Sequence, residues 1–489
     1  MDGSGAREAP YIGWRLLGLT DDEVQQIHQG TLDVLQNCGV RVLSAEALDL
    51  LESGGCHVDR ATNRVRVPGH LVEEAIDSAP SKVLLAARDP AHDVLLEDGR
   101  TYFTTFGQGL RVIDPYTAEV RSSTARDIAD SALLADALEH VSVYTVAVAA
   151  TDIPEGPNKS LCELEVAFAH TSRHVVHGEI ASGEGVRRLV EMAAAIVGGA
   201  DKLRERPIVS AGGCPSSPLE HSERVCEIVM ECARAGIPAA VVSMVMAGGT
   251  GPVTLAGTLV THNAEVLSGL VLHQLAAKGA PFLYGSCTTA MDMTYGTAPL
   301  GSPESGLLSA GVAALARYYA LPSVVAGGWA DSKLTDAQAG HEKTLTTLLV
   351  GLAGPSLVLG MGSLELGMTL SLAQLVIDDE TVAMVERVVG GVRVTDETLA
   401  VDLIKEMGPG KDFLGQKHTR AHQREEQSKV GLIDRRMRGG WEKRGGKDLA
   451  QRAAERAREI LETHKPEPLS PEVAVELRTI AMGEDRGKR

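Results

Sequence analysis

The chain has few aromatic residues, no paired cysteine motif and no excess of basic charge. Its 489 residues include seven cysteines, an odd number without a C-x-x-C spacing. We therefore expect reduced thiols, and neither a disulfide framework nor a closed structural zinc site. A formal net charge of −18 argues against a nucleic-acid binder, because contact with phosphates needs clustered Lys and Arg.

Long apolar runs are also missing. The first residues, MDGSGAREAPYIGW, have no basic segment followed by an apolar one, so no export signal is expected. The runs AAVVSMVMAGG and VSVYTVAVAA are too short to span a bilayer and are interrupted by Gly, Ser or Thr. We interpret them as buried strands and expect a cytoplasmic protein that contacts no membrane.

The residues that are present favour a large folded core with additions at both ends. Hydrophobic residues make up 44% of the chain and charged residues 23%. Residues 1–100 are predicted to form an N-terminal α/β cap that includes the hairpin HVDRATNRVRVP. Residues 101–392 form the central domain, and residues 393–489 form a charged, helical C-terminal extension.

The central domain repeats a strand and a helix eight times. The eight apolar runs are TYFTTF, VSVYTVAVAA, RHVVHGEI, RPIVSAGG, IPAAVVSMV, APFLYGS, LPSVVAGG and PSLVLGM. This rhythm predicts an α/β fold, a (β/α)8 TIM barrel with its active site at the C-terminal strand ends. An open doubly wound sheet is the alternative, but no G-x-G-x-x-G follows a first strand and GGTG lacks the P-loop Lys.

Polar residues after the strands are the candidates for a site, because barrel chemistry belongs on these loops. They include His177, Glu179, Tyr284, Asp292, Tyr295, Trp329, Asp331 and Glu365. A catalytic zinc would need about three ligands, and His177, Cys214 and Cys287 could converge. Their spacing matches no metal motif, so buried thiols and a hydrogen-bonded histidine are the favoured interpretation.

The stretch GGWADSKLTDAQAGHEK, residues 327–343, is the most specific of these loops. Thr335 followed by Gln338 reads as a capping box, so a helix is predicted to begin there. Its N-terminus would favour an anion, while Trp329 offers a face to a cation. His341 lies on the same side as Gln338, although a core histidine bonded to a carbonyl is an equally good interpretation.

Several motifs together resemble one known family. They are VIDPYTAEVRSST, MAGGTGPVTLAGTLVTHNAEVL, APFLYGS, GSPESGLLSAG, GGWADSKLTDAQAGHEKTL, GSLELGMTLSLAQLVIDDE and GPGKDFLGQKHT. From about Asp21 to Met482 the chain resembles the trimethylamine methyltransferase family of corrinoid-dependent enzymes. It is most similar to the branch without pyrrolysine, which is typified by glycine betaine:corrinoid methyltransferase.

The resemblance implies a barrel that passes a methyl group from an amine to the Co(I) corrinoid of a separate carrier protein. No tightly bound cofactor or metal is implied, and the carrier would dock over the C-terminal barrel face. Family members named for trimethylamine carry a pyrrolysine, whereas every position here is a standard residue. The expected donor is therefore a quaternary amine similar to glycine betaine.

In this interpretation Trp329, Tyr284 and Tyr295 enclose the trimethylammonium group, although aromatics make up only 3% of the chain. Asp292, Asp331 and Glu365 supply negative charge. His341 and the helix N-terminus hold a substrate carboxylate, with Gln338, Glu179 and His177 as further binding candidates. No catalytic residue is assigned.

Other interpretations stay open at this level. The donor could be trimethylamine or another methylamine, and the barrel could bind betaines without catalysis. A lyase or a zinc methyltransferase is a third possibility. A homo-oligomer is expected, with the extension beyond Pro409 at an oligomer contact or at the carrier surface.

Overall fold

An eight-stranded parallel sheet forms the centre of the computed structural model, which describes residues 18–428 and 431–483. The strands are β6 (Tyr102–Thr105), β9 (Tyr144–Thr145), β10 (Val175–His177), β11 (Val209–Gly213), β13 (Ala239–Ser243), β15 (Phe282–Ser286), β17 (Ser323–Ala326) and β18 (Leu357–Met361). Each falls within one of the eight predicted runs. Strand β18 pairs with β6, and a bridge between Thr104 and Val143 joins the two remaining edges. The predicted barrel is confirmed.

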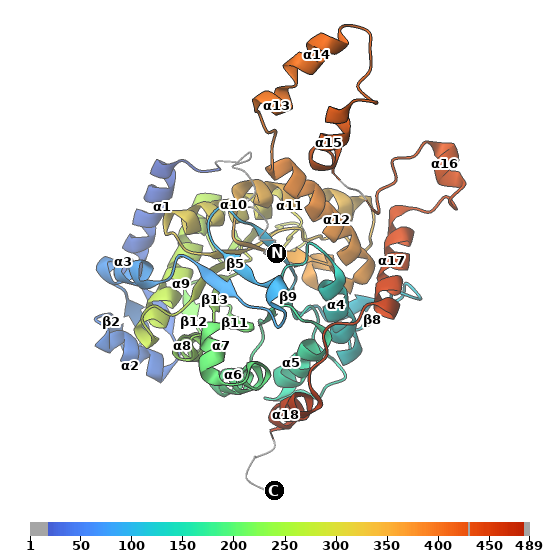
Figure 1. Cartoon of the computed structure of the whole chain (residues 1–489). Coiled ribbons are helices and arrows are strands. Elements are labelled where there is room, and N and C mark those ends of the chain that lie inside the picture. Colours follow the sequence, from blue (N-terminus) through green and yellow to red (C-terminus); the bar gives the residue numbers. More distant parts are fainter. Residues whose placement is uncertain (1–17, 429–430, 484–489) are drawn as a thin grey trace.

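A helix follows every strand and the eight helices form a ring around the sheet (Figure 1). They are α4 (Ala125–Ala137), α5 (Lys159–His170), α6 (Gly183–Val197), α8 (Glu223–Ala235), α9 (Leu255–Ala276), α10 (Pro303–Tyr318), α11 (Ala337–Ala353) and α12 (Leu372–Val389). Ser182, Ser222 and Ser302 begin three of them by accepting a hydrogen bond from a first-turn backbone N–H. The loop before each helix therefore ends at a defined residue.

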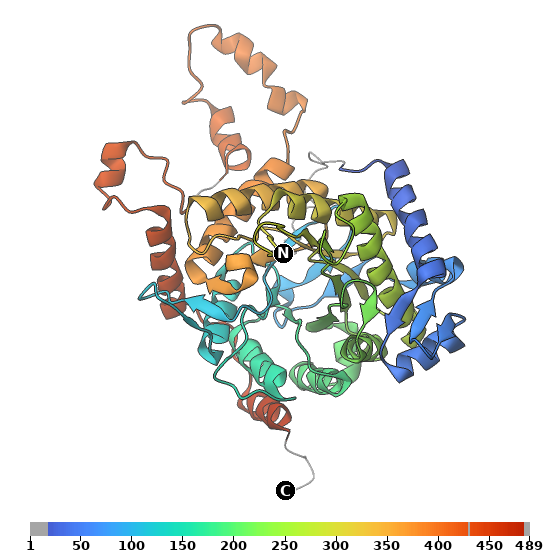
Figure 2. The same ribbon diagram turned by 180° about the vertical axis from the view of Figure 1, so that it is seen from behind.

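A hairpin closes the N-terminal end of the barrel. Its strands β4 (Val83–Leu85) and β5 (Val94–Leu96) are antiparallel. Leu85 and Leu96 pack against side chains that point into the barrel, such as Leu283 and Val324. The hairpin lies in front of the barrel in Figure 1, so Figure 2 shows the opposite end, where the strands finish.

The N-terminal cap packs on the outside of the barrel. It contains α1 (Asp21–Asp33), α2 (Ala45–Ser53) and α3 (Gly69–Ser78), all of which contact α9. Its strands β2 (His57–Asp59) and β3 (Arg64–Arg66) form the predicted hairpin. Residues 1–17, on which the expectation of no export signal rests, lie outside the described residues.

Helix α9 is, among residues 18–428 and 431–483, the one helix long and apolar enough to cross a membrane. Fifteen of its 22 residues are buried between the cap and the barrel strands. Its apolar character is that of a core helix covered on both sides.

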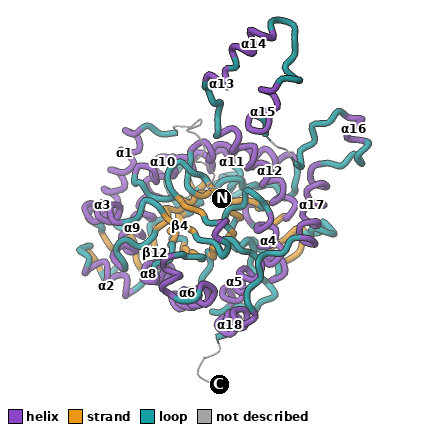
Figure 3. The backbone as a smooth tube through the Cα atoms, viewed as in Figure 1, coloured by secondary structure: helices purple, strands orange, loops and turns teal. Residues whose placement is uncertain are grey.

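The C-terminal extension divides into two parts. Helices α17 (Leu449–Thr463) and α18 (Pro471–Met482) pack on the ring, α17 against α12 and α4, and α18 against α5 and α6. Helix α17 has an apolar stripe, because Ala453, Ala457 and Ile460 are buried. Residues 392–426, here called the arm, project away from the ring of helices, at the top of Figure 3.

The arm holds α13 (Asp396–Leu399), α14 (Val401–Met407) and α15 (Lys417–Glu426), none of which has a buried residue. A short helix α16 (Arg438–Glu442) follows before α17. Residues 484–489 of the expected extension, and residues 429–430, are not among those described.

Candidate active site at the barrel mouth

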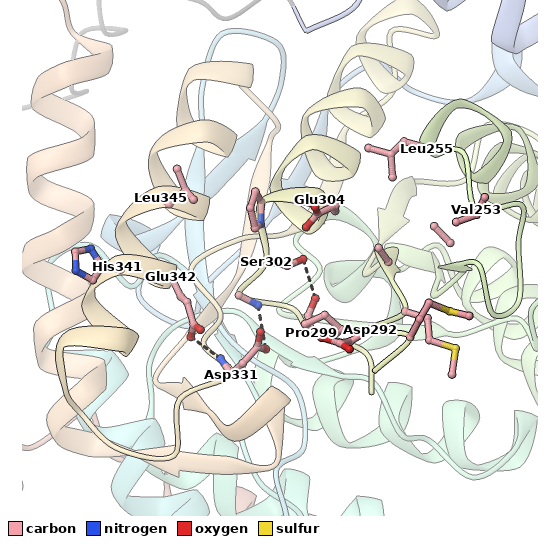
Figure 4. A pocket seen from close by; sticks show the side chains of 16 residues that line it. Val253, Leu255, Asp292, Pro299, Ser302, Glu304, Asp331, His341, Glu342 and Leu345 are labelled. Carbon is pink, nitrogen blue, oxygen red and sulfur yellow. Dashed lines mark hydrogen bonds between the residues drawn. The ribbon is translucent and has the colours of Figure 1, made fainter. Parts of the chain in front are cut away.

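The loops after β13, β15 and β17 build a pocket of about 790 Å³ on one side of the barrel mouth (Figure 4). Two short parallel strands, β14 (Met246–Ala247) and β16 (Thr289–Ala290), extend the first two loops. The pocket is lined by Ala247, Val253, Leu255, Ala290, Met291, Asp292, Met293, Pro299, Gly301, Ser302, Pro303, Glu304, Asp331, His341, Glu342 and Leu345. Its position at the C-terminal strand ends is where barrel enzymes place their chemistry.

The pocket lining is acidic and apolar. Four carboxyl groups line it, and neither Lys nor Arg is among its lining residues. The other lining side chains are mostly aliphatic, including two methionines whose sulfur atoms are visible in Figure 4. Such a lining suits an organic cation with methyl groups, because the carboxylates attract its charge and the apolar wall contacts its carbon surface.

Asp331 ties two loops of the pocket together. One oxygen, Oδ1, accepts hydrogen bonds from the backbone N–H groups of Leu300 (2.9 Å) and Gly301 (3.1 Å). Burial is the main cause that raises the pKa of Asp331, although those backbone hydrogen bonds oppose it and the neighbouring Glu342 adds to it. A bound cation would favour the charged form of this carboxyl group.

Glu342 reaches from the first turns of α11 back to the same loop. Its Oε2 accepts hydrogen bonds from the backbone N–H groups of Asp331 (2.7 Å) and Ser332 (3.2 Å), and Figure 4 shows the first of these. Its Oε1 accepts from the Gln338 amide at 2.7 Å. The loop after β17 is thus held by two backbone hydrogen bonds to one oxygen of this carboxylate, and the Gln338 side chain orients the other oxygen.

Asp292 shapes the tip of the loop after β15. Its Oδ1 accepts hydrogen bonds from the N–H groups of Thr294 (2.8 Å) and Tyr295 (3.0 Å), which closes a tight turn. Tyr295 at this turn is 79% exposed. It does not line the pocket and stands at the rim of the mouth.

The predicted start of α11 is wrong by one residue. The N-cap is Asp336, whose side chain accepts from the Ala339 N–H at 3.0 Å, and Thr335 precedes it. Aspartate is at least as good an N-cap as threonine, so the later residue prevails. Its carboxylate already occupies the helix N-terminus, where the sequence suggested a substrate carboxylate. His341 is exposed and lines the pocket, whereas Gln338 does not line it and its amide donates to Glu342.

The three predicted aromatic residues do not form a cage. Tyr284 is fully buried on the outer side of the sheet, and its hydroxyl donates to Asn263 Oδ1 of α9 at 2.5 Å. Trp329 is 6% exposed; its Nε1 donates to the Leu359 carbonyl at 2.5 Å. Because two of the three rings are enclosed by protein, they cannot surround a ligand together with Tyr295.

Glycines explain how the Trp329 ring fits at the mouth. A Cβ atom at Gly360 or Gly367 would overlap the indole, so the ring lies where one residue of β18 and one residue of the following loop have no side chain. Its edge also meets Phe106, with 5.6 Å between ring centroids. Trp329 is therefore a packing residue of the mouth.

Three further candidates hold the barrel wall and lie outside the pocket. Glu365 pairs with Arg111 at 3.2 Å and accepts from the Thr369 hydroxyl. Glu179 pairs with Arg224 at 2.8 Å. His177 is buried, and its Nε2 contacts Glu163 of α5 at 3.1 Å. Of the ten predicted residues, the pocket brings together Asp292, Asp331 and His341.

Sequence reasoning missed two acidic lining residues, Glu304 and Glu342. Glu304 lies in the first turn of α10, directly after the cap Ser302 and Pro303, and such positions favour acids for helix stability alone. Glu342 follows His341 in the same predicted helix. Both residues could have been predicted from the sequence, because helices α10 and α11 start at the mouth and acidic residues in their first two turns therefore lie near it.

The possible zinc ligands do not assemble. Within residues 18–428 and 431–483, no group of three His, Cys, Asp or Glu side chains could hold a metal ion. Burial raises the pKa of the Cys214 thiol to about 12, which disfavours the thiolate that a metal needs. His177 already contacts Glu163.

A closed (β/α)8 barrel with an acidic pocket at its mouth is the architecture of a barrel enzyme. Comparison with known proteins gives the family. Residues 14–484 match the model of the trimethylamine methyltransferase (MTTB) family, and the chain belongs to it. The chain is accordingly a methyltransferase.

Three relatives cover nearly the whole chain. A trimethylamine methyltransferase of Desulfitobacterium hafniense (strain DSM 10664 / DCB-2) is 50% identical over 96% of this chain and 94% of its own. One from Methanosarcina thermophila is 43% identical over 93% and 94%. A glycine betaine methyltransferase of Desulfitobacterium hafniense (strain Y51) is 35% identical over 96% and 97%.

Proposed function

We propose that the protein transfers a methyl group from a quaternary amine to the Co(I) corrinoid of a carrier protein. The observation that carries the proposal is the mouth pocket, where four carboxyl groups face aliphatic and methionine side chains without Lys or Arg. A quaternary ammonium group has a permanent positive charge and a methyl surface, so it matches both parts of this lining.

The chemistry fits a site without an assigned acid or base. When a Co(I) nucleophile attacks one methyl carbon in line, the C–N bond breaks and its electron pair leaves with a neutral tertiary amine. No proton has to move in this step. The protein then needs to hold and orient the donor, and positioning alone can lower a barrier by roughly 7–11 kcal/mol.

In this proposal the carboxylates replace the aromatic cage expected from the sequence. Asp331 and Asp292 would attract the cation from the loops, and Glu304 and Glu342 from the neighbouring helices α10 and α11. Asp292, Asp331 and Glu342 each hold a loop through backbone hydrogen bonds, so the positions of these three carboxylates are fixed before a ligand arrives.

Trimethylamine is the second candidate donor. The 50% identity to a relative named for trimethylamine favours it over glycine betaine, whose named relative is 35% identical. Against it stands the resemblance described above, in which trimethylamine enzymes carry pyrrolysine, because this chain has standard residues throughout. A neutral trimethylamine would also have to leave as an amide anion unless it is first made positive.

We further propose that the corrinoid carrier docks over the mouth. Exposed apolar side chains stand on the loops there, on a surface that otherwise carries charge. They are Leu110, Met244, Val253, Met293, Tyr295, Leu334 and Met368. Docking at this rim would bring the corrinoid to the open side of the pocket.

A homo-oligomer formed through the arm is proposed from its charges and exposed apolar residues. Residues 395–408 carry Asp396, Glu397, Asp402 and Glu406 against one lysine, while residues 409–424 carry Lys411, Lys417, Arg420 and Arg424 against one aspartate. In the oligomer, the acidic segment of one copy would pair with the basic segment of the other copy. Reversing charge with Lys417→Glu and Arg420→Glu is expected to lower the mass measured by light scattering; an unchanged mass would contradict the proposal.

The function is tested by mixing the protein with cob(I)alamin and a panel of methylated amines, and by following absorbance as Co(I) becomes methyl-Co(III). Tetramethylammonium, choline and glycine betaine represent quaternary donors, and trimethylamine the second candidate. Turnover with a quaternary amine supports the proposal. Turnover with trimethylamine alone overturns the quaternary donor, and calorimetric binding without any turnover identifies a non-catalytic barrel.

A further inference from the structure

A buried ion pair lies beneath the loops that follow β17 and β18, next to the pocket, and joins these two loops. Lys343 lies on α11 and Asp378 on α12, and their side chains are 2% and 6% exposed. Lys343 Nζ is 2.9 Å from Asp378 Oδ2. Both side chains are buried, and removing two charges from water costs free energy, so a charged pair here needs an explanation.

The lysine donates to the loop after β17 and to the end of β18. Its Nζ donates to the Gly328 carbonyl at 2.5 Å and to the Gly360 carbonyl at 3.4 Å. Gly328 has a φ of +70°, so the chain turns away from the sheet there. A carbonyl at such a turn has lost its regular ladder partner, and the ammonium group supplies one.

The aspartate holds the second loop from the other side. Its Oδ2 accepts from the Gly362 N–H at 2.7 Å, and its Oδ1 accepts from the Gln374 amide at 2.8 Å. Gly362 also has a positive φ, +83°. One ion pair therefore satisfies backbone groups on both strand ends.

The two loops are also joined above the pair. The N–H of Glu365 donates to the Ser332 carbonyl at 2.8 Å, and the N–H of Leu366 donates to the Ala330 carbonyl at 3.1 Å. Asp331, which lines the pocket, lies between these two acceptors. An interaction that holds the base of the two loops therefore also holds the Asp331 carboxyl group in place.

We propose that Lys343 and Asp378 are positioning residues that set the place of Asp331 in the mouth pocket by clamping the loops after β17 and β18. They act through Gly328, Gly360 and Gly362. The effect on methyl transfer rests on the proposed function, whereas the clamp itself does not.

An apolar replacement separates this role from a merely structural one. Replacing a buried ion pair by apolar residues of similar volume often leaves stability unchanged or raises it. The double variant Lys343→Met with Asp378→Leu is therefore expected to melt at or above the wild-type temperature. It still removes every hydrogen bond from the pair to the three glycines, so the loops should shift.

Trp329 reports the loop position without any need for activity. It follows Gly328 directly, and with Trp14→Phe and Trp441→Phe it is the one tryptophan left in the chain. We expect the double variant to show red-shifted emission and stronger acrylamide quenching. In a methyl-transfer assay we expect KM for a quaternary amine to rise and kcat/KM to fall at least tenfold.

A matched control uses an ion pair at the closed end of the barrel. Arg206 contacts Asp93 at 2.7 Å and 2.9 Å, and Arg206→Met with Asp93→Leu makes the same chemical change there. This control should keep the wild-type emission and kcat/KM. Similar changes in both double variants would overturn the proposal.

Asp378→Asn provides a second test should the double variant not fold. It keeps the shape of the side chain and removes its charge. Altered Trp329 emission together with weaker tetramethylammonium binding in calorimetry supports the clamp; wild-type emission and binding would overturn it. Absence of methyl transfer by the wild-type protein would refute the proposed function and leave the emission result to decide the clamp.

Discussion

The two ends of the barrel differ in almost every physical property. At the N-terminal end, the β4–β5 hairpin fills the opening with aliphatic side chains, and Leu85 and Leu96 are fully buried. At the mouth, the loops carry carboxyl groups, left-handed glycines and exposed apolar residues. The closed end contributes stability by burial, and the open end holds polar groups that cost stability and permit binding.

The largest expected effect comes from the same leucine-to-alanine change at each end. Leu85→Ala should lower the free energy of unfolding by about 2–5 kcal/mol, because it opens a cavity in a fully buried contact. Leu345 lines the pocket and is 49% exposed, so Leu345→Ala should cost less than about 0.5 kcal/mol. Urea denaturation measures both; equal losses would remove the distinction between the ends.

Glycine substitutions should show that part of the mouth is tightly packed. Gly367→Ala adds a Cβ that overlaps Trp329 at a φ of +84°, and we expect a loss of about 2–4 kcal/mol. Gly408 in the arm also has a positive φ, +66°, but nothing lies within 4 Å of its Cβ position. Gly408→Ala should therefore cost only about 1–2 kcal/mol. Thermal unfolding of the two variants tests this order.

The pocket charge should matter for binding more than for folding. Asp331→Asn is expected to weaken binding of a quaternary ammonium ion about tenfold, or about 1.4 kcal/mol. The control Asp402→Asn removes a charge from the exposed arm and should leave binding unchanged. Calorimetric titration with tetramethylammonium compares them, and an equal effect of both would point to net charge alone.

The same aspartate should give the pocket its pH dependence. Because burial raises the pKa of Asp331, the group is protonated at a higher pH than an ordinary aspartate. Cation affinity should fall as the pH is lowered through that raised pKa, and recover as the pH is raised. Asp331→Asn should lose this part of the profile. A variant that keeps the wild-type profile would assign it to another group.

The smallest expected effect concerns His341. This side chain is exposed at the pocket edge, and a solvent-exposed charge contact is worth under about 1 kcal/mol. His341→Ala should change glycine betaine affinity less than about fivefold and leave tetramethylammonium affinity unchanged. A larger loss for glycine betaine alone would restore the carboxylate-binding role predicted from the sequence.

Sequence reasoning placed the strands well and the helix start less well. All eight barrel strands were identifiable because they are apolar runs bounded by turn residues. The start of α11 was placed one residue early, since Thr335 and Asp336 are both good caps and only the three-dimensional contact with Ala339 chooses between them.

In the candidate site, too, the sequence predicts some residues correctly and others not. Asp331 and His177 both come at or just after a strand end, yet Asp331 lines the pocket and His177 faces α5. His177 lies in β10, where the alternation of side chains along the strand turns it outward, whereas Asp331 lies five residues beyond β17, where the path of the loop places it. Residue type alone also does not show that the Tyr284 side chain faces α9 and not the pocket.

The sequence by itself determined the barrel, the acidic character of its loops and the family resemblance, because these depend on local pattern and composition. Only the tertiary structure decided which acids share one pocket, that Trp329 is enclosed by two glycines, and that Lys343 meets Asp378 35 residues away. The physical reason is that these contacts join separate strand ends. Their geometry is set by closure of the barrel and not by any single stretch of chain.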